Sequence, residues 1–383
     1  MALSRKSKFP PVRFAQALFL GLLLGVLSVL SVPAPVNPVS KEFKIVTVAE
    51  DLDQPWGLAF LPDGTMLVTE KIGRLRLIGV GGLDPRPIEG LPEIFPQGQG
   101  GLLDVVLHPD YPRNQWIYLS YSGGSPGLTG TEVLRARLNL KDYRLDDVKI
   151  IFKMQPKLDA NHHFGSRLLF DDKGYLFITL GERGQMQESQ NLGSHQGKVV
   201  RLHDDGTVPK DNPFVGVAGA LPEIYTYGHR NVQGIAMHPV TRQIWTHEHG
   251  PRGGDEVNIL KPGANYGWPV ITYGINYDGS TITTETHREG MEQPVLFWVP
   301  SIAPCGMMFY TGNKFPAWKG NLFVGALGKM HLRRVVFDQK GRPVDGQELL
   351  LELRERIRNV RQGPDGSIYI LTDSRNGSVL RLE

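Results

Sequence analysis

One phrase recurs along the chain and limits its fold more than any other feature. An apolar strand is followed by a turn rich in Pro, Asp and Gly, and then by a second strand of β-branched and aromatic residues. Such turns suit tight hairpins. The six copies lie at residues 57–70, 101–122, 166–182, 234–250, 307–327 and 360–374. Because these units bury their faces only against neighbouring copies, the sequence predicts an all-β fold, a six-bladed β-propeller, as one domain over residues 43–383.

The segment before the first copy, FKIVTV at residues 43–48, has no hairpin partner nearby. We expect it to pair as the outer strand of the last blade, which removes a free sheet edge. A large β-sandwich is the alternative architecture, but six similar hairpin units favour radial repetition. The long insertions at 186–230 and 251–300 are candidates for loops that build a functional site.

The charge balance argues against a nucleic-acid partner. The chain has 42 Lys+Arg and 39 Asp+Glu, and four of the bases precede residue 35, so the remaining domain is near neutral. A near-neutral domain lacks the basic surface that nucleic acids require. The single cysteine excludes a disulfide framework, an iron–sulfur cluster and a haem-attachment pair. This residue, Cys305, lies in an apolar stretch and is expected to be buried.

Residues 1–34 resemble a targeting segment. Basic residues at 5–13 precede the largely apolar run Ala15–Val32. This order predicts a secretory signal peptide, and the run also reaches the lower limit for a spanning helix, so an N-terminal membrane anchor is the alternative. In either case we expect the domain to be exported, periplasmic or otherwise outside the cytoplasm, and held at the inner membrane if the anchor is retained.

A candidate catalytic pair lies in the third copy. His163, in the stretch NHHFG at 161–165, comes just before a strand, where a histidine can act as a general base. Glu182 ends the hairpin that this strand begins, so its carboxylate can approach and orient the imidazole. The alternatives are a hydrogen-bonded loop histidine and an exposed turn glutamate.

Two clusters of planar donors point toward the predicted channel. Arg230, Asn231 and Gln233 precede or begin an apolar strand and can contact whatever occupies the channel mouth. Arg356 and Arg358 alternate along a strand, so both guanidinium groups face one side. They repel each other unless an anion lies between them, which favours a multiply carboxylated ligand bound together with Arg230. Loop-to-loop hydrogen bonds and a solvated basic strand are the alternatives.

The stretch HEHGPRGGDE at residues 247–256 is a candidate metal site. Zinc is disfavoured because no third His or Cys follows at ligand spacing. The Gly/Pro bend followed by Asp255 and Glu256 suits calcium, whose oxygen ligands include backbone carbonyls. The segment Gly123–Gly127 matches a nucleophile-elbow pattern but lies at a hairpin tip, so a serine hydrolase is rejected. From residue types alone, redox and hydrolytic chemistry both stay open.

Eight motifs, in order from Leu52 to the C-terminus, resemble those of the soluble pyrroloquinoline-quinone (PQQ) glucose/sorbosone dehydrogenase family, of the bacterial periplasmic aldose sugar dehydrogenase type. They are PWGLAFLPDG, GQGGLLDVVLHPDY, NHHFGSRLLF, GHRNVQGIA, EHGPRGGDEVN, NYGWP, PSIAP and RIRNV. The family fold is a six-bladed propeller, which agrees with the repeat count.

The resemblance implies a PQQ-dependent enzyme that oxidises an aldose at its anomeric carbon to a lactone. It makes His163 the general base, Glu182 the group that orients it, and Arg230 the group that stabilises negative charge on the quinone. The other cofactor-pocket residues that it implies are Gln99, Asn231, Gln233, Tyr277, Ser301, Lys329, Arg356 and Arg358.

Two calcium sites are also implied. Gly250 and Pro251 match backbone carbonyls that hold a catalytic calcium ion, which activates the quinone for the hydride. Glu256 and the carbonyl of Tyr266 match a second, structural calcium site. Lys329 lies in the stretch ALGKMHLRR, which needs a one-residue gap to match the family pattern.

The implied partners are an aldose sugar and an external electron acceptor, since the chain has no haem motif. The loops are short beside those of the dimeric glucose-specific members, so we expect a monomer without tight glucose selectivity. Two alternatives stay open, a calcium-dependent lactonase and a non-catalytic binding propeller.

Overall fold

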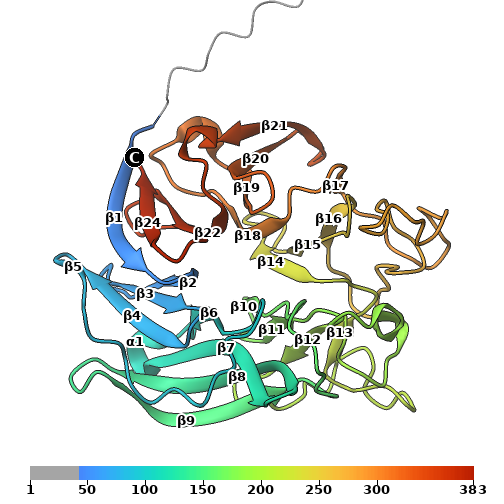
Figure 1. The fold of residues 1–383 in the computed structure, drawn as a ribbon, viewed down its shortest axis with the longest axis horizontal. Helices are drawn as coiled ribbons and strands as arrows, with labels where there is room; N and C mark the ends of the chain where they lie inside the picture. The colour runs from blue at the N-terminus through green and yellow to red at the C-terminus, as the bar shows by residue number, and fades with distance from the viewer. Residues whose placement is uncertain (1–42) are drawn as a thin grey trace, which may run out of the picture. The chain divides into compact units, whose positions relative to one another are not determined.

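The computed structural model describes residues 43–383, which form six four-stranded antiparallel sheets arranged as blades in a ring (Figure 1). The prediction of an all-β, six-bladed propeller is therefore confirmed. The expectations for residues 1–34 lie outside the described residues. Among residues 43–383, no helix has both the length and the apolar character needed to cross a membrane.

Five blades contain four strands that follow one another in the chain. The first blade contains β2 (Pro55–Phe60), β3 (Met66–Glu70), β4 (Arg74–Gly79) and β5 (Gly82–Leu83). The second contains β6 (Leu102–Leu107), β7 (Trp116–Ser125), β8 (Leu128–Asn139) and β9 (Arg144–Lys153). The third contains β10 (Leu168–Phe170), β11 (Leu176–Thr179), β12 (Val199–Leu202) and β13 (Ile224–Thr226). The fourth blade contains β14 (Val232–Met237), β15 (Ile244–Glu248), β16 (Asp255–Ile259) and β17 (Leu296–Trp298). The fifth contains β18 (Pro304–Phe309), β19 (Leu322–Ala326), β20 (His331–Phe337) and β21 (Pro343–Leu349). The short helices are α1 (Tyr111–Asn114), η1 (Met186–Gln190), η2 (Pro316–Trp318) and η3 (Leu351–Leu353).

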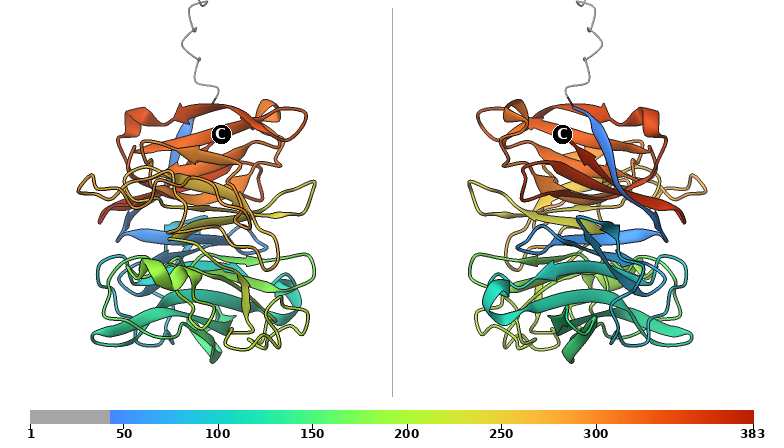
Figure 2. Two further views of the ribbon diagram at one scale, coloured as in Figure 1. Left: turned by 90° about the vertical axis from the view of Figure 1, so that its right-hand side faces the viewer. Right: turned by 90° about the vertical axis from the view of Figure 1, so that its left-hand side faces the viewer.

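The sixth blade is built from both ends of the described chain. It contains β22 (Ile357–Gln362), β23 (Ile368–Thr372), β24 (Gly377–Leu382) and, at its edge, β1 (Ile45–Leu52). β1 pairs antiparallel with β24, and Figure 2 shows the blue first strand beside the red last one. The predicted pairing of residues 43–48 with the last blade is confirmed, and the paired strand continues to Leu52.

Each predicted copy forms the first two strands of a blade, and the first strands of neighbouring blades contact one another around the channel.

The turn residues act as the pattern predicts. The side chains of Asp63, Asp171 and Asp365 each accept a hydrogen bond from the backbone N–H two residues later. Gly64 and Gly366 adopt left-handed φ values of +87° and +76°, which glycine tolerates without strain. Local turn chemistry thus sets the hairpin register.

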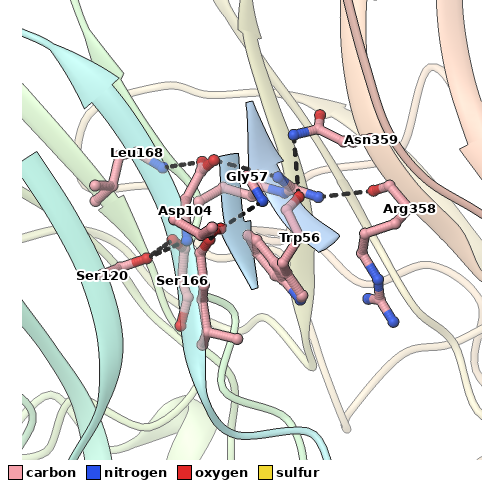
Figure 3. Close-up of polar contacts among 12 residues, drawn as sticks. Trp56, Gly57, Asp104, Ser120, Ser166, Leu168, Arg358 and Asn359 are labelled. Atoms are coloured by element: carbon pink, nitrogen blue, oxygen red, sulfur yellow. Dashed lines mark hydrogen bonds and ion pairs between the residues drawn. The ribbon is translucent and has the colours of Figure 1, made fainter. Parts of the chain in front are cut away.

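Arg167, immediately before β10, lies at the centre of the ring with only 1% of its surface exposed. Its guanidinium contacts one residue of each of the other five blades. Figure 3 labels three of these partners, Trp56, Asp104 and Arg358, which come from different blades and lie near one another. The full set is Trp56, Asp104, Gln233, Cys305 and Arg358.

The contacts of Arg167 include one ion pair and three other polar bonds. Its Nη1 lies 3.3 Å from Asp104 Oδ1, and its Nε donates to the carbonyl of Gln233 at 2.9 Å. Its Nη2 donates to the carbonyl of Arg358 at 2.9 Å and to Cys305 Sγ at 3.3 Å. Cys305 is buried, as predicted, but it serves as a polar partner and not only as an apolar one.

We predict that Arg167→Met strongly destabilises the propeller. The substitution leaves buried Asp104 without its closest cation, and breaking a buried ion pair typically costs about 3–5 kcal/mol. The free energy of unfolding, measured by urea denaturation, should fall by that amount. Arg242→Met is the control, because Arg242 and its partner Asp172 are both exposed. Equal stability of the two variants would contradict a central role for Arg167.

Candidate functional site

A cavity of about 350 Å³ opens at one end of the channel, above Arg167 and its partners. Six predicted residues line it: Gln99, Asn231, Gln233, Tyr277, Arg356 and Arg358. The cavity also contains residues to which the sequence analysis gave no role in the cofactor pocket, among them Trp56, Lys71, Phe164, His249 and Asp373. Three cations and one carboxylate therefore border it, which leaves an excess of positive charge.

His163 and Glu182 form a buried pair that is not itself part of the cavity lining, although Gln99, which binds the backbone of His163, and Phe164, which follows it, both line the cavity. The distance from His163 Nδ1 to Glu182 Oε2 is 2.5 Å, and only 9% of His163 is exposed. The backbone N–H of His163 donates to the side-chain oxygen of Gln99 at 2.8 Å, and the Glu182 carboxylate also accepts from the N–H of Gly184. The hairpin places Glu182 against the imidazole, as the sequence predicts.

The electrostatics of the pair favour a neutral imidazole. Burial lowers the pKa of His163, and Arg230 and Arg183 act in the same direction against the raising effect of Glu182. Burial alone would raise the pKa of Glu182, but the hydrogen bond from His163 brings it below its ordinary value. The ring then carries its proton on Nδ1, facing the carboxylate, and leaves Nε2 able to accept a proton.

Arg356 and Arg358 do face the same side, but the anion between them belongs to the chain itself. Arg356 Nε and Arg358 Nη2 each lie 2.9 Å from Asp373 Oδ2. Repulsion between the two guanidinium groups therefore does not by itself require a bound anion, and their binding of a carboxylated ligand stays a prediction. Lys71 adds a third cation, with Nζ 2.8 Å from the carbonyl of Gly98. Burial, followed by the charge of Arg358, lowers the pKa of Lys71.

A repeat signal could have revealed Asp373. An acidic residue stands at or just after the end of the second strand in four of the six copies. These residues are Glu70, Glu182, Glu248 and Asp373. Equivalent positions in a propeller lie at the same end of the channel, so the third-copy argument for Glu182 extends to the other three.

Ser301 and Lys329 do not line the central cavity. They border an adjoining open recess together with Pro251, and the recess shares Tyr277 and Ala303 with the cavity. Tyr277 stands at the common rim and is 71% exposed. The long insertion at 251–300 thus contributes to the mouth of the site, as expected for a site-building loop.

The Gly250 bend is held by Asp255. The Asp255 carboxylate accepts hydrogen bonds from the N–H groups of Gly250, Ile302 and Ala303 and from the hydroxyl of Ser301. Burial raises the pKa of Asp255 to about 6. Its oxygens are occupied by these donors, so the suggestion that Asp255 supplies a calcium ligand is not supported by its geometry.

Arg230 fixes the other side of the bend. Its Nη1 donates to the carbonyls of His249 and Gly250, at 3.1 and 2.9 Å, and its backbone N–H donates to Glu248 Oε2 at 2.6 Å. The guanidinium also lies over the Trp268 ring. These bonds hold Arg230 close enough to His163 for its charge to lower the pKa of the His163 imidazole.

A small niche of about 10 Å³ lies behind the bend and contains two carboxylates, those of Glu248 and Glu256, with Tyr266 in its wall. Burial and the neighbouring Glu248 charge raise the pKa of Glu256 to about 8. Two carboxylates and nearby backbone carbonyls form a hard oxygen donor set that fits calcium. Within residues 43–383 no three His, Cys, Asp or Glu side chains gather around one point, so backbone oxygens are needed to complete a metal site.

A carboxylate-held imidazole beside a cationic cavity defines an enzyme site on a six-bladed propeller. The family described as glucose/sorbosone dehydrogenase matches residues 52–381. The chain belongs to this family, and it is an oxidoreductase. This membership confirms the predicted resemblance and favours an oxidoreductase over the lactonase and binding-propeller alternatives.

Three relatives illustrate the membership. The chain is 46% identical over 375 residues to aldose sugar dehydrogenase YliI of Escherichia coli (strain K12), covering 96% of this chain and 98% of that protein. It is 26% identical to quinoprotein glucose dehydrogenase B of Acinetobacter calcoaceticus, covering 88% and 86%. The PQQ-bound form of an aldose sugar dehydrogenase from Streptomyces coelicolor matches with a TM-score of 0.73 at 27% identity, covering 90% and 99%.

We predict that the metal-free protein loses stability as the pH rises. Burial and the Glu248 charge raise the pKa of Glu256 in the folded protein to about 8, whereas the ordinary value of a glutamate is 4.5. The stability that protonated Glu256 contributes is fully present below the ordinary pKa of 4.5, and it is lost as the pH rises to the folded-state pKa of about 8. The thermal midpoint should therefore fall between about pH 5 and 8, and added calcium should restore it because the cation holds the ionised pair.

Glu256→Gln should show a much smaller pH effect and no response to calcium. Glu289→Gln, which alters an exposed carboxylate, is the matched control and should behave as the unaltered protein. A calcium response that survives in Glu256→Gln would show that the niche is not the cation site.

Proposed function

We propose that this chain is a PQQ-dependent aldose sugar dehydrogenase that oxidises the anomeric carbon of an aldose to a lactone. Its membership of the glucose/sorbosone dehydrogenase family and the names of its relatives support sugar oxidation. The observation that carries the proposal is the buried His163–Glu182 pair, whose neighbours Gln99 and Phe164 line a cavity rich in cations.

The cavity has the donor set that a carboxylated quinone needs. Lys71, Arg356 and Arg358 exceed the single charge of Asp373. Asn231 Nδ2 is buried and has no hydrogen-bond partner among the described residues, and Asn231 lines the cavity. Guanidinium groups bind carboxylates with two parallel hydrogen bonds, so this set fits PQQ. Gln99 and Gln233 add amide groups to the wall, and Tyr277 adds an exposed ring at the mouth.

The protein's own part in the chemistry is proton transfer. His163 Nε2 accepts the proton of the sugar's anomeric hydroxyl, while Glu182 holds the ring and stabilises its charged form. Arg230, fixed beside the bend, supplies a positive charge near the site of reaction. PQQ, when bound, supplies the carbon that accepts the hydride.

Calcium is proposed at the two places that the family resemblance indicates. The carbonyls of Gly250 and Pro251 would hold the ion that polarises the cofactor. Glu256 and the Tyr266 carbonyl would hold the structural ion in the niche beside Glu248. The Gly250 carbonyl accepts one hydrogen bond from Arg230, and a carbonyl oxygen has a second lone pair with which it could bind a metal.

The setting of the reaction is also a proposal. We infer that the domain works outside the cytoplasm, in the periplasm, either freed by signal cleavage or anchored by residues 1–34. It acts there as a monomer, and an external electron acceptor reoxidises the cofactor. Ser301 and Lys329, at the open recess beside the cavity, are proposed to contact the outer part of the cofactor.

We predict that His163→Gln abolishes turnover but keeps cofactor binding. Removing a general base lowers rates by about 10²- to 10⁴-fold, and glutamine preserves the size and polarity of the site. Reduction of an artificial dye by an aldose, with added PQQ and calcium, gives the rate, and PQQ titration gives the affinity. His238→Gln is the control, because His238 lies in the turn after β14. Full turnover by His163→Gln would remove His163 from the mechanism.

We predict that the double variant Arg356→Ala, Arg358→Ala mainly loses affinity for PQQ. It removes two of the three cations and leaves Asp373 unpaired at the cavity wall. Loss of two charge-assisted contacts should weaken PQQ binding by about 100-fold or more. At saturating PQQ, turnover should be far less affected. Unchanged affinity would show that the cofactor does not bind these guanidinium groups, and Arg342→Ala serves as an exposed control.

A further inference from the structure

The backbone at His163 is in an unfavourable conformation. His163 has a φ of +54°, in the left-handed region, and Gly165 and Ser166 follow at +63° and +81°. A non-glycine residue keeps such a conformation only when its surroundings impose it, and this is common at functional sites. Something must therefore hold the segment from Ala160 to Phe164 in place.

The side chain of Arg183 contacts this segment on both sides of His163. Its Nη1 donates to the carbonyl of His162 at 2.8 Å, and its Nη2 donates to the carbonyl of Ala160. Its guanidinium carbon lies 3.5 Å from the centre of the Phe164 ring. One arginine side chain thus contacts both His162 and Phe164, the residues directly before and after His163.

The hydrogen bonds of Arg183 stabilise it, but none of them is to a carboxylate. Besides the segment, its Nη2 reaches the hydroxyl of Thr129 at 3.1 Å, and only 1% of the residue is exposed. Burial lowers the pKa of Arg183 to about 10. A buried guanidinium bound by carbonyls and a ring is expensive to maintain.

Arg183 also follows Glu182 directly in the chain. Its own φ is +60° and that of Gly184 is +81°, so the backbone turns sharply at this point. The turn sends the Glu182 carboxylate to the imidazole and the Arg183 guanidinium to the backbone around it. Two adjacent residues therefore fix the ring and the chain that carries it.

We propose that Arg183 is a positioning residue for the reaction, which holds residues 160–164 so that His163 stays bound to Glu182 and faces the substrate. The proposal rests on the general-base role of His163 given above. Arg183 does not line the central cavity. It acts through His163 and contacts neither sugar nor cofactor.

The charge of Arg183 has a second effect that a purely structural residue would not have. The titratable and charged groups that act on His163 or are acted on by it are Glu182, Arg183, Arg230, His162 and His249. Arg183 and Arg230 lower the pKa of His163, and Glu182 raises it. Loss of the Arg183 charge should therefore move the acid limb of the pH–rate profile to higher pH.

The test compares Arg183→Met and Arg183→Lys with Arg201→Met. Arg201 is a matched control, since it is a buried arginine in the same blade with Asn212 and Asp211 as partners. In the dye assay with PQQ, calcium and an aldose, Arg183→Met should lower kcat by about 10- to 100-fold, as expected for a misplaced catalytic group. KM and PQQ affinity should change little. The acid limb of the pH–rate profile of Arg183→Met should shift to higher pH. Arg183→Lys should keep the acid limb at the original pH but have a lower kcat.

A third variant keeps the test decisive. A separate cavity of about 370 Å³ is lined by Arg183, His162 and Phe164, so guanidinium ion has access to the space that Arg183→Ala would leave. Added guanidinium should restore part of the lost kcat in Arg183→Ala and none in Arg201→Met.

Three results would overturn the proposal. They are unchanged kcat and pH profile in Arg183→Met, a parallel loss of PQQ affinity and thermal midpoint, and absence of guanidinium rescue. An unaltered protein that reduces no dye with any aldose would instead overturn the proposed function itself, and the two failures are therefore distinguishable.

Discussion

A single guanidinium at the axis joins the six blades, and the rest of the molecule depends on that junction. Arg167 binds Asp104 in the second blade, backbone carbonyls in the fourth and sixth, a sulfur in the fifth and a tryptophan face in the first. A planar group with five donors can satisfy several neighbours at once, which no aliphatic side chain can do. The central cavity is built on this junction, because Trp56, Gln233 and Arg358 both line it and contact Arg167.

The site shows how one repeated position acquires different tasks. The acidic residue that follows the second strand orients an imidazole in the third blade and pairs with two arginines in the sixth. In the fourth blade, Glu248 binds a histidine and the backbone of Arg230 and faces Glu256 in the niche. Blade geometry brings these positions to one end of the channel, and the local partners decide what each carboxylate does.

The fold could be predicted because its signals are local: hairpin turns, alternating strands and a repeated phrase. The His163–Glu182 pair could be predicted for the same reason, since one hairpin joins them. Lys71 and Arg167 could not, because the groups that they contact lie outside their own hairpins. Asp373 was missed although it occupies the repeated acidic position and meets Arg356 and Arg358 within one hairpin. Arg183 was missed for a different reason: its partners are mainly backbone carbonyls, and these leave no residue pattern to detect.

The pairing of β1 with β24 has a consequence for how the protein is made. Lys44 and Glu383 exchange backbone hydrogen bonds of 2.7 and 3.0 Å, so the ring closes only when the last strand has been synthesised. A chain without β24 would leave the edges of β1 and β23 unpaired, and unpaired edges favour association with other chains. Loss of the last strand would thus also leave the first strand unpaired, because β24 is the only strand of the sheet, among the described residues, that pairs with β1.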